Sequence, residues 1–205
     1  MTKLLGRYFT LGLLCIGFTT WVGAAPLQPG TPAPAFTGQG SDGKTYSLTD
    51  YKGKFVVLQW YNKDCPFIHK HYDSANMQML QSAYGKKGVI WFEVASSAPG
   101  REGYMTAAEA QANRAKVMSR AAATLLDRNG KIAKLYEAKT TPHVFVIDPK
   151  GILIYNGAID DHASADMSDI PNSKNYVAAA LDEAMAGKPV TTPLTRPYGC
   201  SVKYQ

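Results

Sequence analysis

Cys65 followed by Pro66 is the residue pair most able to do chemistry in this chain of 205 residues. An apolar run over residues 55–60 predicts a buried strand ahead of the pair, and the residues behind it are compatible with a helix that ends near Tyr84. Proline suits the first helical position, because its missing N–H needs no partner there and its φ is already helical. Cys65 would then be the N-cap, where unpaired N–H groups and the positive end of the helix dipole favour a thiolate.

An anion-stabilising position combined with partial exposure is what a reactive thiol requires. We therefore predict that Cys65 is a redox nucleophile. The neighbouring charges act in opposite directions, since Lys63 supports a thiolate and Asp64 opposes it. The alternative is that Cys65 is a buried cysteine that packs as a small apolar side chain.

The first 24 residues have the pattern of a secretory signal peptide. Lys3 and Arg7 form a basic start, an apolar stretch covers residues 11–18, and the small residues Val22 and Ala24 suit a cleavage site. The apolar stretch is short for a transmembrane helix and no second one follows, so we expect no stable membrane anchor. We expect cleavage near Ala24 and a periplasmic or secreted protein.

Loss of the leader would remove Cys15 and leave two of the three cysteines, Cys65 and Cys200. Two thiols in an exported chain indicate a potential disulfide. Cys200 is thus a candidate resolving thiol, and the alternative is a free or purely structural cysteine on a mobile tail. The formal net charge of +6 is spread along the chain without a clustered basic stripe, so we expect no nucleic-acid partner.

Strands and helices are expected to alternate along the rest of the chain, which favours an α/β fold. Strands are expected at residues 55–60, 89–95, 124–127, 143–148 and 152–155, and helices at residues 66–84, 106–120, 131–138 and 175–186. Thr106 and Glu109 have the spacing of a capping box at the start of the second helix. We predict one domain over residues 25–188 and an extended, proline-rich tail over residues 189–205 that carries Cys200.

Several separated segments resemble the peroxiredoxin-like branch of the thioredoxin superfamily, which is grouped with alkyl hydroperoxide reductase and thiol-specific antioxidant proteins. They are Asp64-Cys65-Pro66-Phe67, Ser96-Ser97-Ala98-Pro99-Gly100, Thr141-Pro142, Asp148-Pro149-Lys150-Gly151, Ala158-Ile159-Asp160-Asp161 and Tyr198-Gly199-Cys200-Ser201-Val202-Lys203. The resemblance covers roughly residues 30–205. It implies a thioredoxin-like fold, with a central mixed β-sheet flanked by helices, an N-terminal extension and the extended tail.

The resemblance also implies an exported thiol-dependent oxidoreductase, similar to peroxiredoxin antioxidants, with Cys65 as its redox nucleophile. Its substrate would be peroxide or protein thiols and disulfides, and an unidentified thiol reductant would regenerate it. No cofactor is implied. Cys200 would resolve the sulfenic acid or mixed disulfide that forms on Cys65, provided that the tail folds back across the site.

Two departures from the family patterns define the other site candidates. Ile68 stands where a C-x-x-C motif has its second cysteine, and Pro142 stands at about the position of the peroxiredoxin arginine. By analogy with thioredoxin-fold proteins, Pro142 would be a cis-proline that shapes, with Thr141, the groove where a substrate thiol docks. Asn62, three residues before Cys65, and His69 would tune the site.

A second hypothesis uses the histidines around the cysteine. Cys65 and His69 are four residues apart and share a helix face, and His143 would approach them beside Pro142. One thiolate and two imidazoles are suited to copper. The alternative to the thiol enzyme is therefore a non-catalytic copper-binding or redox-sensing module that uses Cys65, His69 and His143.

Overall fold

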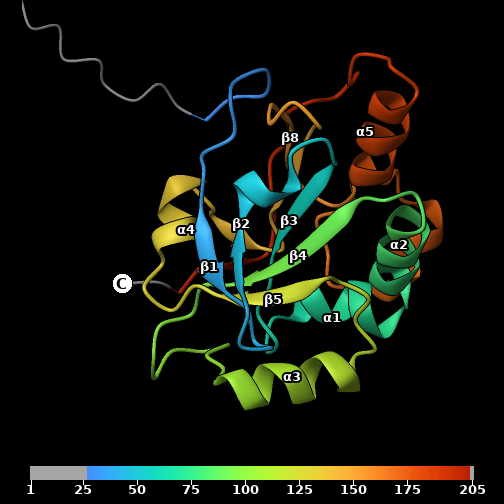
Figure 1. Ribbon diagram of the computed structural model, residues 1–205. Helices are drawn as coiled ribbons and strands as arrows, with labels where there is room; N and C mark the ends of the chain where they lie inside the picture. Colours follow the sequence, from blue (N-terminus) through green and yellow to red (C-terminus); the bar gives the residue numbers. More distant parts are fainter. Residues whose placement is uncertain (1–26, 204–205) are drawn as a thin grey trace, which may run out of the picture.

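The computed structural model describes residues 27–203, and a mixed five-stranded sheet forms its centre (Figure 1). In spatial order, the strands are β5 (Ala123–Leu126), β4 (Ile90–Ala95), β3 (Val56–Trp60), β7 (Val144–Ile147) and β8 (Leu153–Gly157). β3 is parallel to β4 and β4 to β5, whereas β7 is antiparallel to both β3 and β8. The expected mixed sheet is confirmed. The expected signal peptide lies outside the described residues.

In the described part of the chain, two small sheets and five α-helices surround this centre. The small sheets pair β1 (Thr37–Gln39) with β2 (Thr45–Ser47), and β6 (Thr140–Thr141) with β9 (Cys200–Ser201). The α-helices are α1 (Pro66–Asp73), α2 (Asn76–Gly85), α3 (Ala107–Lys116), α4 (Lys131–Leu135) and α5 (Tyr176–Met185), and short 3₁₀ helices cover Leu48–Tyr51 and Met167–Asn172. Within residues 27–203, no helix combines the length and the apolarity needed to cross a bilayer.

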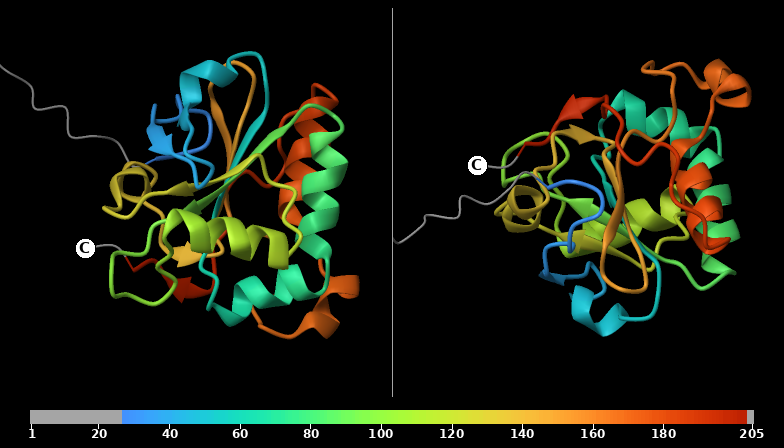
Figure 2. Two further views of the ribbon diagram at one scale, coloured as in Figure 1. Left: turned by 60° about the horizontal axis from the view of Figure 1, so that its bottom comes forward. Right: turned by 90° about the horizontal axis from the view of Figure 1, so that it is seen from above.

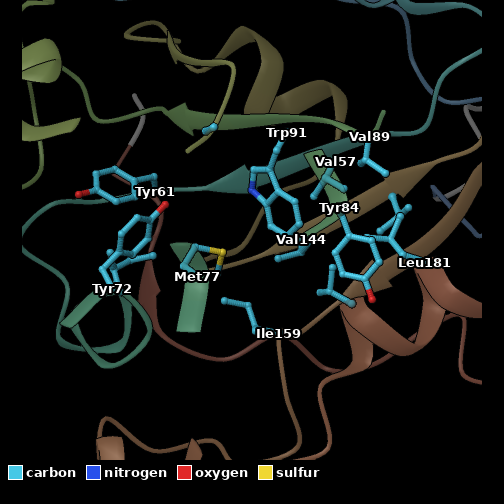
Figure 3. Close-up of a cluster of buried hydrophobic side chains, with 14 of the residues drawn as sticks. Val57, Tyr61, Tyr72, Met77, Tyr84, Val89, Trp91, Val144, Ile159 and Leu181 are labelled. Atoms are coloured by element: carbon cyan, nitrogen blue, oxygen red, sulfur yellow. The ribbon is translucent and has the colours of Figure 1, made fainter. Parts of the chain in front are cut away.

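The two faces of the sheet bury different sets of side chains, because neighbouring residues of a strand point to opposite sides. Val57, Trp91 and Val144 face the helices α2 and α5, where Tyr84 and Leu181 meet them (Figure 3). The other face buries a second cluster against α4. Its members are Phe36, Val56, Leu58, Trp60, Phe92, Val94, Ala123, Leu125, Ile132, Ala133, Tyr136, Ala138, Phe145, Ile147 and Leu153. Figure 1 shows α4 on one side of the sheet and α2 and α5 on the other.

Three helix boundaries differ from the sequence-based expectation. α4 ends at Leu135 rather than at residue 138. The single helix expected to run to Tyr84 is interrupted at Ala75, whose φ of 61° is left-handed and incompatible with a continuing α-helix. α3 ends at Lys116 rather than near Arg120, and Met118 just beyond it also has a left-handed φ, of 51°. The capping box that begins α3 is confirmed.

Candidate thiol site

Cys65 lies where the chain leaves β3 and enters α1. It is the N-cap of α1 with extended φ and ψ of −82° and 123°, and Pro66 follows it in the first turn, as predicted. The Cys65 carbonyl accepts hydrogen bonds from the amides of Ile68 and His69, at 2.9 and 3.0 Å. These bonds fix the backbone of the cysteine, so its sulfur occupies one place at the start of the helix.

The side chain of Cys65 is buried rather than partly exposed, with 0% of its surface accessible. Its Sγ donates a hydrogen bond to the Thr141 carbonyl oxygen at 3.0 Å and lies 2.7 Å from the Sγ of Cys200. Both cysteines are free thiols. The structure therefore brings together two of the predicted site residues that are 135 positions apart in the sequence.

Cys200 reaches this place because the tail forms a strand beside the Thr141-Pro142 turn. In the β6–β9 pair Thr141 is opposite Cys200, and the Thr141-Pro142 bond is cis, as the resemblance implied (the red strand in Figure 2). Gly199 allows the close approach. Its φ is +127°, and a Cβ there would lie 2.1 Å from the Thr141 carbonyl oxygen. Sequence analysis considered a mobile arm, whereas the described part of the tail is packed in place.

The environment of Cys200 keeps its proton on the sulfur. Burial raises the pKa of Cys200 to about 12, and the hydrogen bond with Cys65 and the charge of Cys65 act in the same direction. Cys200 therefore remains a thiol at neutral pH.

Asn62 is buried and holds the turn that carries Cys65. Its Oδ1 accepts a hydrogen bond from the Asp64 amide at 2.9 Å, and its carbonyl oxygen accepts one from the Cys65 amide at 3.2 Å. Its Nδ2 donates to Glu102 Oε1 at 3.2 Å. A Cβ at Gly103 would lie 2.3 Å from the Asn62 side chain. Asn62 therefore shapes the Cys65 turn through the backbone rather than by contact with the sulfur.

The two candidate histidines are directed elsewhere. His69 is half exposed, and its Nδ1 pairs with Asp73 Oδ2 at 3.2 Å. His143 is buried: its Nδ1 accepts from the Lys139 amide at 3.2 Å and its Nε2 contacts Asn156 Oδ1 at 2.8 Å. Burial lowers the pKa of His143 to about 4. Both ring nitrogens of His143 are thus in use.

These positions bear on the copper hypothesis. Within the described part of the chain, no group of three or more His, Cys, Asp or Glu side chains is placed to hold a metal ion. Cys65, His69 and His143 are therefore not assembled into a site here, although their spacing suggested one. Helical spacing fixes a shared helix face but not the direction of each imidazole, and copper binding stays a prediction.

Sequence analysis did not identify the residues that hold the tail. They are Gly199, Tyr198 and the buried groups that Tyr198 contacts. A glycine directly before the tail cysteine was a visible signal of close backbone approach. No pattern in the sequence indicated the partners of Tyr198, because they are on other elements.

This chain is similar to several known proteins. The AhpC/TSA family model matches residues 29–156. The thioredoxin peroxidase of Fasciola hepatica is 53% identical over 45 residues, which are 20% of this chain and 23% of that protein, so this chain spans only about a quarter of that relative. The thiol-disulfide oxidoreductase ResA of Bacillus thuringiensis subsp. konkukian (strain 97-27) is 29% identical over 158 residues, 74% of this chain and 86% of that protein.

A solved structure confirms that the fold is a known one. An uncharacterized conserved protein from Geobacillus kaustophilus has a TM-score of 0.74 and 24% sequence identity over 87% of this chain and 93% of that chain. The sheet order, the cis-proline turn beside the helix N-terminus and the family match confirm the expected thioredoxin-like architecture. The chain belongs to the AhpC/TSA family.

Proposed function

We propose that this protein is a thiol–disulfide oxidoreductase in which Cys65 is the nucleophile and Cys200 the resolving thiol. The observation that carries the proposal is the 2.7 Å separation of the two sulfurs at the N-terminus of α1. The family match and the ResA relative, a thiol-disulfide oxidoreductase, support the same chemistry. The two thiols of the protein would supply the two electrons that reduce the substrate disulfide.

The first step is attack on an external disulfide. Ionised Cys65 is stabilised by the N-terminal end of α1 and attacks one sulfur of the substrate. The substrate S–S bond breaks, one substrate thiolate leaves, and a mixed disulfide remains on Cys65. Cys65 has no exposed surface and half-buried Cys200 lies against it, so the tail must shift before the substrate reaches the sulfur.

The second step resolves the mixed disulfide. Cys200 loses its proton and attacks the Cys65 sulfur, and the second substrate thiolate leaves as the Cys65–Cys200 bond forms. In total the protein gives up two electrons and two protons, and the substrate becomes two thiols. Thr141 and Pro142 form the wall at which the two cysteines meet, and Asn62 holds the Cys65 turn in place. An external thiol reductant would restore both thiols.

A peroxidase is the second candidate, and the local identity to a thioredoxin peroxidase favours it. In that reaction Cys65 attacks the terminal peroxide oxygen, the O–O bond breaks, and an alcohol or water leaves as the sulfenic acid forms. Cys200 then attacks the sulfenic sulfur and releases water. Both reactions end in the same disulfide, so the two candidates differ in the oxidant alone.

We also propose that the protein works outside the cytoplasm. The proposal rests on the signal-peptide pattern of residues 1–24 and on the presence of two thiols that can form a disulfide, which persists in oxidising compartments. Cleavage near Ala24 would leave both Cys65 and Cys200 in the mature chain.

Intact mass of residues 25–205, measured with and without alkylation, tests the function. One equivalent of oxidised glutathione or of hydrogen peroxide is added. We expect a loss of two hydrogens and no alkylatable thiol, and we expect Cys65→Ser to abolish the reaction. In Cys200→Ser, glutathione should remain attached to Cys65, or one oxygen should be added by peroxide. The faster oxidant identifies the reaction, and two free thiols after both treatments would contradict the proposal.

A further inference from the structure

We propose that Tyr198 is a positioning residue. It binds the tail to a buried ion pair between α1 and the segment after β8, and it thereby holds Cys200 against Cys65. This inference deepens the proposed function, and its redox consequence rests on that function. Tyr198 is two residues before Cys200, and the helix that it contacts begins directly after Cys65. One tyrosine therefore connects the two thiol-bearing segments.

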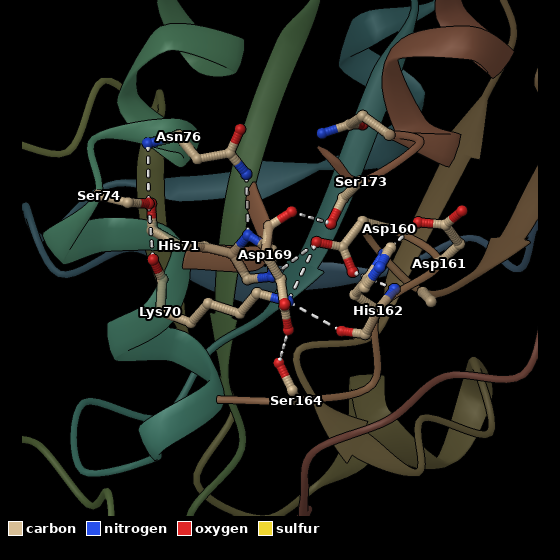
Figure 4. A network of polar contacts seen from close by, with 12 residues as sticks. Lys70, His71, Ser74, Asn76, Asp160, Asp161, His162, Ser164, Asp169 and Ser173 are labelled. Carbon is tan, nitrogen blue, oxygen red and sulfur yellow. Dashed lines mark hydrogen bonds and ion pairs between the residues drawn. The ribbon is translucent and has the colours of Figure 1, made fainter. Parts of the chain in front are cut away.

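The ion pair joins α1 to the segment after β8. Lys70 and Asp160 are 1% and 2% exposed, and Lys70 Nζ lies 3.4 Å from Asp160 Oδ2 (Figure 4). Lys70 Nζ also donates to the His162 carbonyl oxygen at 2.8 Å. Buried charges are retained only when partners and hydrogen bonds offset their desolvation. The ion pair is therefore a fixed anchor. The other carboxylate oxygen, Asp160 Oδ1, also requires hydrogen-bond donors.

Tyr198 supplies one of those donors and accepts a hydrogen bond itself. Its hydroxyl donates to Asp160 Oδ1, and its oxygen lies 3.2 Å from His71 Nε2. The Asn76 side-chain amide donates to His71 Nδ1 at 2.8 Å, so the single proton of the neutral ring is on Nε2. Burial lowers the pKa of His71 to about 4, which keeps the ring neutral at pH 7. Every hydrogen bond in this series is therefore donated in the same direction, from Asn76 to His71, from His71 to Tyr198 and from Tyr198 to Asp160.

The ring of Tyr198 adds contacts with the same helix. Its centroid is 5.8 Å from that of Phe67, and Lys70 Nζ lies 5.6 Å from the Tyr198 centroid. An ammonium over an aromatic face is attracted by the ring quadrupole. Tyr198 therefore contacts α1 with both its ring and its hydroxyl.

Backbone hydrogen bonds with Lys139 and Ala98 hold the tail after Cys200, and Tyr198 holds it directly before Cys200. β9 contains two residues, and the tail before it carries Pro189, Pro193 and Pro197, which cannot donate backbone hydrogen bonds. A tethered thiol attacks in proportion to its effective concentration, which falls when the tether samples more space. Loss of the Tyr198 hydroxyl should therefore lower the effective concentration of Cys200 at Cys65 by about tenfold, given the worth of a hydrogen bond to a charged group.

The first test measures release of the tail without any redox step. In a Cys65→Ser background, the rate of Cys200 alkylation by iodoacetamide is compared between Tyr198→Phe and Tyr84→Phe. Tyr84 is the control, because its hydroxyl also donates a hydrogen bond across two elements, to the Ala178 carbonyl oxygen at 3.0 Å, but from α2 to α5 rather than from the tail. We expect about tenfold faster labelling in Tyr198→Phe and no change in Tyr84→Phe. Equal rates in the two variants would overturn the proposal.

The second test uses the chain with both cysteines and measures the equilibrium between its thiols and oxidised glutathione. We expect Tyr198→Phe to shift the constant about tenfold toward the dithiol, and Tyr84→Phe to leave it unchanged. Faster labelling with an unchanged constant would show that Tyr198 only stabilises the fold, which also refutes the positioning role. If the parent chain forms no Cys65–Cys200 disulfide, the proposed function fails, and the labelling test still decides whether Tyr198 holds the tail.

Discussion

The two thiols lie 2.7 Å apart, yet the structure holds them by opposite means. Cys65 is fixed by its neighbours in the sequence: β3 before it, Pro66 after it, and the Asn62 turn, which accepts its amide proton. Cys200 is fixed by distant partners, because its strand pairs with Thr141 and the nearby Tyr198 bonds to Asp160. The difference shows that the position of Cys65 is set by local structure, whereas the position of Cys200 depends on tertiary contacts.

Segments that depend on few tertiary contacts open at lower free-energy cost than the core of a domain. We therefore expect the two-residue pairing of β9 with β6 to open at lower cost than the β3–α1 junction that carries Cys65. This asymmetry suits the proposed cycle, in which a substrate must displace the tail before Cys65 is reached and the tail must then return.

The largest effect on the thiol equilibrium is expected from Gly199→Ala, which alters the strand that carries Cys200. The new Cβ would lie 2.1 Å from the Thr141 carbonyl oxygen, and the φ of +127° disfavours any side chain. We expect the equilibrium between the dithiol and the Cys65–Cys200 disulfide to shift toward the dithiol by at least about a hundredfold, which corresponds to about 2.7 kcal/mol. Titration against glutathione measures the shift.

Gly187→Ala is the matched control for that substitution. Gly187 also has a left-handed φ, of +71°, but a Cβ there has nothing within 4 Å. The control should cost about 1 kcal/mol of stability through backbone strain and leave the thiol equilibrium unchanged. An unaltered equilibrium in Gly199→Ala would show that the tail reaches Cys65 without this close approach.

The same asymmetry explains what the sequence predicts and what it does not. The N-cap position of Cys65 and the capping box at Thr106 follow from residues within four positions of each other, so sequence reasoning found both. The central strands were also predictable, because each is a short apolar run. Interactions between residues that are close in the sequence are sufficient to predict these elements.

Other features depend on residues that meet only in the folded chain. The complete burial of Cys65 requires Cys200 and Thr141 to cover it, and the anchor of Tyr198 requires Asp160 and α1. The break at Ala75 was also missed, since alanine favours a helix and seldom adopts a left-handed φ. Propensity and periodicity carry no information about these contacts.

An effect of pH on the free energy of unfolding is expected from two buried histidines, one of which faces the tail. Burial lowers the pKa of both His71 and His143 to about 4 from an ordinary value near 6.5. Below pH 6.5 the unfolded chain binds protons that the folded chain does not bind. The stabilisation is therefore complete above about pH 6.5 and is lost as pH falls towards 4, by up to about 3 kcal/mol for each histidine.

Urea unfolding at several pH values between 4 and 7.5 should show this loss, and His71→Gln or His143→Gln should each remove about half of it. His71 faces Tyr198 of the tail directly, together with Lys70 and Asp160. The two ring nitrogens of His143 instead bond to Lys139 and Asn156, outside the tail. In a Cys65→Ser background, pH-dependent labelling of Cys200 should therefore flatten in His71→Gln and persist in His143→Gln. The same labelling profile in both variants would mean that the tail and the core open together.

The smallest effect is expected from His69→Ala, on the Cys65 side. Sequence analysis assigned His69 a role in tuning the thiol, but its imidazole pairs with Asp73 at 3.2 Å and is half exposed. An exposed pair with i,i+4 spacing contributes no more than about 0.5 kcal/mol to stability. We expect the rate of Cys65 alkylation in a Cys200→Ser background to change by less than about twofold, since a solvent-screened imidazole adds little to the helix dipole. A tenfold slower reaction would instead place His69 among the groups that stabilise the thiolate, and local structure would then determine the reactivity of Cys65 as well as its position.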